Sequence, residues 1–176
     1  MIKKLSFLAI LLFAFLLFGC SHKETGFLEY QSKSFNAEAV LEISSKEYSV
    51  SIRREENGDT ALTFLSPSEI SGASVKKTGD KLWFSVGDVS IPLKSTSNIT
   101  AQALKLFELS KNELTYSNAA LLNGVKVNVA EFECDFGKVT LYLSTDTELP
   151  VMIESVIKGT ELSLSFSEFT VNQNNS

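Results

Sequence analysis

Few side chains in this sequence could do catalytic chemistry. The chain has two cysteines, Cys20 and Cys134, and its single histidine is His22. A cysteine nucleophile needs a neighbouring base that lowers the pKa of its thiol, and His22 stands close only to Cys20. Cys134 shares one parity with Phe132 and Phe136, so we expect it to be a small core residue.

The acidic residues do not form a catalytic pair. Most of them fall at polar positions of alternating segments or in turns: Glu55, Glu56, Asp59, Asp80, Asp88, Glu131, Glu133 and Asp135. Acid–base catalysis and zinc binding need convergent groups, and a calcium site built from turn carboxylates has no supporting ligand spacing. We therefore predict that the chain is not an enzyme and holds no cofactor and no metal.

Three other side chains are candidates for binding. Trp83 lies on the parity opposite Leu82 and Phe84, so a sheet covered on one side cannot bury both sets. Trp83 then faces a partner or a ligand, or it is covered by a helix or a loop. Arg53 and Arg54 stand before a predicted turn, where they either pair with an acidic partner or are ordinary strand-end charges.

The N-terminus has the order of an export signal. Lys3 and Lys4 precede the apolar run Leu5–Phe18, which Gly19 and Cys20 close. As a helix, this run would reach about 21 Å, short of a membrane core of roughly 30 Å. These features favour a cleaved signal peptide over the alternative, an uncleaved membrane anchor.

Cys20 is the expected site of lipidation. Leu17-Phe18-Gly19-Cys20 resembles the bacterial lipobox, although Phe18 stands where a small residue is usual. The resemblance implies that Cys20 becomes the first mature residue and carries acyl chains such as palmitate, and two or three such chains anchor a protein stably. We expect a lipid-anchored protein at the extracytoplasmic face of the cell membrane.

The mature chain is acidic and long enough for one domain. About 157 residues remain after cleavage, and loss of Lys3 and Lys4 takes the formal net charge from −5 to −7. Such a charge disfavours binding to nucleic acid or to anionic lipid headgroups. Only Cys134 remains once Cys20 is lipidated, so no internal disulfide forms.

After residue 34 the sequence alternates between apolar and polar residues, which predicts strands. The pair Asn57-Gly58 predicts a type I′ hairpin turn, and a parity slip near Ala130 predicts a β-bulge. The expected strands are Phe35–Ile43, Tyr48–Ile52, Leu62–Phe64, Ala73–Lys77, Leu82–Val86, Val89–Leu93, Val125–Phe136, Val139–Ser144, Val151–Ile157 and Leu162–Phe169.

One segment between the two sets of strands has helical spacing. Ile99, Ala103, Leu106 and Phe107 fall at i, i+4, i+7 and i+8 and make one apolar stripe. The segment Leu114–Leu122 is left open as a short helix or a strand. The predicted fold class is α+β, mainly β, with a single curved antiparallel sheet (a half-barrel) and a helix across its concave face.

The predicted organisation is a signal peptide over residues 1–19, a lipidated cysteine and tether over 20–34, the half-barrel domain over 35–171 and a polar tail over 172–176.

The chain resembles the lipoprotein-carrier superfamily of the LolA/LolB type. The resemblance rests on two stretches: Tyr48–Arg54 leading through a turn to Leu62–Pro67, and the acidic turn and Leu-Pro step of Leu141–Pro150 before the last two strands. It implies a half-barrel sheet that holds helices over an apolar cavity. Within the superfamily, the chain is most similar to small lipoproteins of clostridia and other Gram-positive spore formers, such as the germination lipoprotein GerS.

This resemblance leaves two functions open. The GerS type acts as the partner of a cortex-processing amidase, which implies a protein-binding role at the cell or spore envelope, during sporulation or germination. The alternative is a carrier that holds a lipid or acyl chain between sheet and helix. A filled core with an exposed apolar sheet edge would favour partner binding, and an open apolar cavity would favour the carrier.

Overall fold

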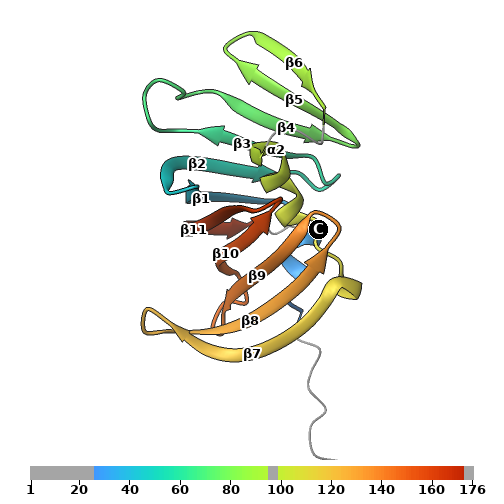
Figure 1. The fold of residues 1–176 in the computed structure, drawn as a ribbon, viewed down its shortest axis with the longest axis vertical. Helices are drawn as coiled ribbons and strands as arrows, with labels where there is room; N and C mark the ends of the chain where they lie inside the picture. The colour runs from blue at the N-terminus through green and yellow to red at the C-terminus, as the bar shows by residue number, and fades with distance from the viewer. Residues whose placement is uncertain (1–25, 95–98, 173–176) are drawn as a thin grey trace, which may run out of the picture.

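The computed structural model describes residues 26–94 and 99–172. Its eleven strands form one open antiparallel sheet (Figure 1), and the predicted fold class is confirmed. The strands are β1 (Phe35–Ile43), β2 (Lys46–Arg54), β3 (Thr60–Phe64), β4 (Ser74–Thr78), β5 (Lys81–Val86), β6 (Val89–Leu93), β7 (Leu114–Leu122), β8 (Val125–Cys134), β9 (Gly137–Ser144), β10 (Pro150–Ile157) and β11 (Thr160–Val171).

The strand order explains why the helical segment crosses the sheet. The order is β6-β5-β4-β3-β2-β1-β11-β10-β9-β8-β7, so β6 and β7 follow one another in the chain but lie at opposite edges. The connection therefore spans the sheet through α2 (Ile99–Ala103) and the 3₁₀ turns η2 (Leu104–Phe107) and η3 (Lys111–Glu113). Figure 1 shows α2 lying over the strands of the β2–β4 region. The helix begins where the apolar stripe predicts it but ends at Ala103, and Leu106 and Phe107 of the stripe lie in the 3₁₀ turn η2.

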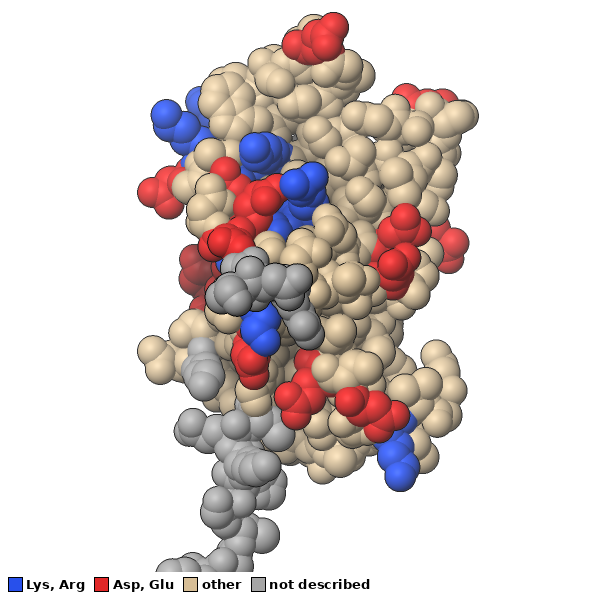
Figure 2. Space-filling view, turned by 180° about the vertical axis from the view of Figure 1, so that it is seen from behind, with Lys and Arg blue, Asp and Glu red and all other residues tan. Residues whose placement is uncertain are grey.

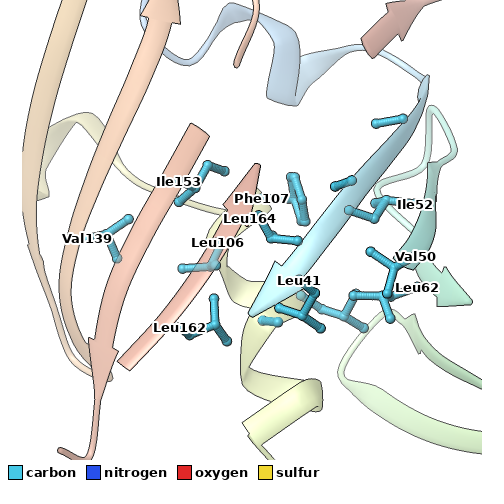
Figure 3. Close-up of a cluster of buried hydrophobic side chains, with 14 of the residues drawn as sticks. Leu41, Val50, Ile52, Leu62, Leu106, Phe107, Val139, Ile153, Leu162 and Leu164 are labelled. Carbon is cyan, nitrogen blue, oxygen red and sulfur yellow. The ribbon is translucent and has the colours of Figure 1, made fainter. Parts of the chain in front are cut away.

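The core lies between this crossing segment and one face of the sheet. Alternate residues of β1, from Phe35 to Leu41, are buried, and the residues between them are exposed. Figure 3 shows Leu106 and Phe107 from the crossing segment among the buried side chains of the sheet. Because side chains alternate between faces, the strands inside the sheet give one row to this core and one row to the outer face, whereas the edge strands β6 and β7 are mostly exposed.

Residues 26–34 pack against the domain, although they were predicted as part of the tether. They form a short 3₁₀ turn, η1 (Glu29–Ser32), whose Tyr30 is only 3% exposed. Phe27 and Leu28 are partly buried against the same core. The folded domain therefore begins before Phe35. Two apolar residues and one tyrosine among polar neighbours were too sparse for a periodicity argument to detect.

The β2–β3 hairpin is where Asn57-Gly58 predicts it, but the predicted turn type is wrong. Gly58 has a φ of 86°, whereas Asn57 is not among the residues with positive φ. The Gly58 amide donates to the Glu55 carbonyl at 3.0 Å, and the Glu55 amide donates to the Asp59 carbonyl at 2.8 Å. This is the pattern of a three-residue loop with glycine in the left-handed position. The Asn57 side chain accepts a bond from the Asp59 amide at 3.0 Å, which favours this turn.

The β-bulge predicted near Ala130 is also misplaced. The register between β8 and β9 is continuous through Ala130, and the irregularity lies in β7, between Leu114 and Tyr116. The parity slip instead reflects Val127, which is buried on the outer face next to Ser144. Leu114–Leu122, left open as helix or strand, is the edge strand β7.

No helix within the described residues has both the length and the apolar character needed to cross a membrane.

Candidate functional site

Cys20 and the signal peptide over residues 1–19 lie outside the described residues. Lipidation of Cys20 therefore stays a prediction. The other three candidates, Arg53, Arg54 and Trp83, lie on β2 and β5. Because Arg53 and Arg54 are neighbours on one strand, their side chains point to opposite faces of the sheet.

Arg54 ties the N-terminal segment to the β2–β3 turn. Its Nε donates to the Gln31 carbonyl at 3.0 Å. Its Nη1 donates to the Gly58 carbonyl at 3.3 Å and to Thr60 Oγ1 at 2.9 Å. Thr60 is fully buried, so it depends on protein groups for hydrogen bonding. These hydrogen bonds give Arg54 a structural part. Arg53 is exposed and forms an ion pair with Glu55 at 2.7 Å, so it is the arginine that an acidic partner can reach.

Replacing these two arginines should separate their effects. We expect Arg54→Ala to lower the free energy of unfolding by about 2 kcal/mol, because it removes three charge-assisted hydrogen bonds, one of them to the buried hydroxyl of Thr60. Arg53→Ala should change it by less than about 0.5 kcal/mol, since exposed ion pairs contribute little. Urea denaturation of both variants measures the difference, and equal losses would contradict this assignment.

Trp83 lies on the outer face, opposite the side that α2 and η2 cover. In β5 its neighbours Leu82 and Phe84 belong to the core side, so of the two predicted covers for Trp83, a helix or a loop, the helix is excluded. Arg53 and Trp83 belong to one cross-strand row, which runs from Arg53 through Ala61 and Lys76 to Trp83 and Pro92. Trp83 is half-buried and borders a hollow of about 400 Å³ that Lys81 and Pro92 also line.

The space between the crossing segment and the sheet is filled by side chains. Phe107 is 0% exposed, and its ring centroid lies 5.5 Å from that of Phe35 and 6.4 Å from that of Phe166. Phe169 extends the cluster, at 4.6 Å from Phe35 and 5.6 Å from Tyr30. These aromatic rings, together with buried Leu104 and Leu106, occupy the position where a carrier of this architecture would need its cavity.

The β5–β6 hairpin exposes apolar side chains instead of burying them. On the face that carries the core elsewhere, Val86, Val89 and Ile91 are each at least half exposed, and Val89 reaches 67%. In Figure 1 this hairpin is the outermost part of its end of the sheet. Exposed apolar patches at a sheet edge are typical of protein–protein contacts. The alternation of Val89–Leu93 predicts a strand and nothing more, and only the position of that strand at the sheet edge leaves these side chains exposed.

The reactive groups of the described residues are poorly placed for catalysis. Burial raises the pKa of the Cys134 thiol to about 12, and the nearby Glu113 carboxylate adds to this effect. Burial also raises the pKa of Tyr142 to about 12, helped by its hydrogen bond to Glu154 at 2.7 Å. Both groups are therefore protonated at neutral pH.

Over residues 26–94 and 99–172, no group of three histidine, cysteine or acidic side chains is close enough to hold a metal ion.

The outer face also carries a shallow groove with an acidic lining. It has a volume of about 500 Å³ and lies over β1 and β9–β11, and its charged residues are Glu42, Glu154, Glu161 and Lys138. Figure 2 shows the molecule from behind, with acidic side chains spread over several parts of the surface and basic side chains in small, separate groups. The described part of this face shows no continuous basic surface of the kind that nucleic acid requires.

No protein-family model matches the chain, and no curated protein matches its sequence. Solved structures do match. A conserved protein of unknown function from Thermus thermophilus superposes with a TM-score of 0.54 at 14% identity, over 82% of each chain. MucB superposes with a TM-score of 0.55 at 14% identity, over 89% of this chain and 61% of MucB. A LolA superfamily protein from Nitrosomonas europaea gives a TM-score of 0.46 at 13% identity, over 84% of this chain and 92% of that one.

At identities this low, the matches with the Thermus protein and with MucB show a common fold and nothing finer. The open antiparallel sheet of this chain is the half-barrel architecture that the sequence resemblance implies. The chain spans less than two thirds of MucB, so the activity of the whole of MucB does not transfer to it. What the chain binds has to be inferred from its own surfaces.

Proposed function

We propose that this chain is a non-catalytic lipoprotein, anchored through Cys20 at the extracytoplasmic face of the membrane, that binds a partner protein at the cell or spore envelope. The partner docks on the β5–β6 hairpin, with Trp83 and Arg53 on the outer face as secondary contacts. Arg53 and Lys76 lie in the same outer-face row as Trp83, so a partner that reaches around the sheet edge from the hairpin can place acidic residues against them.

The observation that carries this proposal is the filled space under the crossing segment. A carrier must bury an acyl chain, and each CH₂ contributes about 0.8 kcal/mol only if it finds an apolar cavity. Here Phe35, Leu104 and Phe107 occupy that space and are fully buried. The apolar surface that stays available lies outside, on the β5–β6 hairpin. This distribution supports protein binding over lipid carriage.

The fold shared with MucB is compatible with this role, because MucB has also been solved in complex with the protein MucA. The resemblance to the lipoproteins of spore-forming Gram-positive bacteria makes a peptidoglycan-processing enzyme the partner of first choice. A function in sporulation or germination would follow from that partner.

Native mass spectrometry can test the proposal. The full-length protein would be purified from cell envelopes in mild detergent after light crosslinking. We expect the protein to carry no bound lipid beyond its own acyl anchor and to crosslink to one envelope protein. A stoichiometric lipid mass on the uncrosslinked protein would contradict the proposal and support the carrier.

Two matched variants test the docking surface itself. Ile91→Glu places a charge in the exposed apolar patch and should reduce crosslinking to the partner at least tenfold, since desolvating one unpaired carboxylate is costly. Val40→Glu makes the same change at an exposed residue on the outer face of β1 and should leave crosslinking unchanged. Equal effects would exclude the hairpin as the docking surface.

The anchor can be tested separately. We expect Cys20→Ala to move the protein from the membrane fraction to the soluble fraction, because acyl chains provide its membrane contact. Its melting temperature should match that of the parent domain. If the variant stays with membranes, Leu5–Phe18 acts as an uncleaved anchor and Cys20 is not the attachment point.

A further inference from the structure

The packed N-terminal segment leaves only a short tether between the proposed lipid anchor and the domain. The Gly26 carbonyl already accepts a hydrogen bond from the Glu29 amide at 2.7 Å, and Tyr30 is 3% exposed. Six residue steps therefore separate Cys20 from the folded part of the chain. Fully extended, six steps span at most about 22 Å. Gly26 cannot lie farther than this from a bilayer that holds the acyl chains of Cys20.

The chain enters the domain at one end of the sheet. Leu28 lines a hollow of about 530 Å³ together with Gly58 of the β2–β3 turn and Asp80 of the β4–β5 turn. The Gly79 amide donates to Asp59 Oδ1 at 3.3 Å, which joins these two turns. This part of the molecule, made of η1 and the β2–β3 and β4–β5 turns, is the entry end.

The opposite end of the sheet, the far end, carries the β1–β2, β5–β6 and β10–β11 turns. The Ser44 amide of the β1–β2 turn donates to the Glu161 carbonyl at the start of β11 at 3.3 Å. A strand rises about 3.3 Å per residue, so the nine residues of β1 separate its two ends by roughly 30 Å. The tether is therefore shorter than the distance from the entry end to the far end along β1.

From this geometry we infer that the entry end faces the bilayer and that the far end, with the tip of the β5–β6 hairpin, faces away from it. The inference rests on the proposed lipid anchor at Cys20. A domain lying on its outer face would place the groove residues Glu42, Glu154 and Glu161 against the membrane. Anionic headgroups repel such a surface. The short tether and the charge of the outer face thus favour the same orientation.

This orientation restricts the class of partner. The tip of the β5–β6 hairpin is Gly87-Asp88, and the six residues of β5 place it roughly 20 Å beyond the β4–β5 turn. The exposed Val86 and Val89 flank this tip. A partner that docks on the hairpin therefore approaches from the side away from the membrane. We expect it to present a water-soluble domain in the envelope space, and not a surface buried in the bilayer.

Energy transfer to labelled lipid headgroups tests the orientation. A fluorescent donor would be attached to Asp80→Cys or to Asp88→Cys, each combined with Cys134→Ala in the full-length lipidated chain. The two positions are matched, because each is an exposed aspartate that follows a glycine with a φ of 54°. The protein would be added to preformed phosphatidylcholine vesicles that carry an acceptor on the headgroup. We expect about twofold more transfer from position 80, because it lies roughly 20 Å closer to the lipid surface.

Co-flotation with the vesicles separates failure of the anchor from failure of the orientation. If the labelled protein does not float with the vesicles, the anchor and the orientation are both wrong. If it floats but position 88 gives equal or greater transfer, the anchor stands and the orientation is overturned.

A longer tether gives the second test. Inserting about twenty flexible glycine and serine residues between Cys20 and Gly26 should bring the two transfer signals together, because such a linker no longer holds one end of the domain near the bilayer. Flotation should not change. A difference between the two positions that survives the insertion would overturn the tether as its cause.

Discussion

Replacing Phe107 with alanine should lower the free energy of unfolding by about 3–5 kcal/mol, the usual cost of removing a buried phenylalanine ring. Phe107 is 0% exposed and lies at the centre of the crossing segment, with the rings of Phe35 and Phe166 next to it. The loss has two sources, because the ring no longer leaves water on folding and because its neighbours cannot fully close the cavity.

Urea denaturation followed by circular dichroism would measure this loss. The matched control is Leu121→Ala on β7, where the side chain is 72% exposed, and its expected change is within about 0.5 kcal/mol. A cost below about 1 kcal/mol for Phe107→Ala would mean that the crossing segment is loosely attached and can lift from the sheet.

The same residue separates the two functional hypotheses. If Phe107 closes a permanently filled core, a fatty acid should not raise the melting temperature of the parent protein. Phe107→Ala then opens apolar space and should begin to bind a fluorescent apolar probe. If the parent protein already gains stability from a fatty acid, the ring is a gate and the carrier hypothesis regains support.

The alternation of apolar residues predicted most of the strands, because one face of the sheet is buried and a misplaced residue there would be costly. The prediction of strands failed where neither face of the strand is buried. β7 has eight exposed residues in a row, so its sequence has no buried side to reveal a period. Val127 is buried on the outer face, so a change of parity suggested a bulge that β8 does not contain.

The candidate site was harder to predict than the fold, because its residues depend on contacts distant in sequence. Alternation places Arg53 and Arg54 on opposite faces, but only the distant Gln31 carbonyl shows that Arg54 has a structural part while Arg53 is exposed. Val89 and Ile91 resemble core residues, and only the strand order puts them at an edge. The filled cavity also depends on tertiary structure, since Phe107 meets Phe35 and Phe166 from distant parts of the chain.

Two glycines that are alike in sequence should respond very differently to alanine. Gly137 begins β9 with a φ of 149°, and a Cβ there would overlap the carbonyl oxygen of Val156 on β10. Gly87, in the β5–β6 turn, has a φ of 54° and open space around it. Gly137→Ala therefore combines backbone strain with a backbone clash that no side-chain rotation can relieve, whereas Gly87→Ala carries strain alone.

We expect Gly137→Ala to lower the free energy of unfolding by at least about 3 kcal/mol, and Gly87→Ala by about 1 kcal/mol. Thermal and urea unfolding of the two variants would provide the comparison. Because Gly137 pairs with Ile157 of β10 as well as with Cys134 of β8, displacing it should loosen β7 and β8 from the rest of the sheet. Hydrogen exchange in Gly137→Ala should therefore rise in β7 and β8 more than in β2 and β3. If Gly137→Ala and Gly87→Ala instead lower the free energy of unfolding equally, β9 and β10 can separate locally without disturbing the sheet.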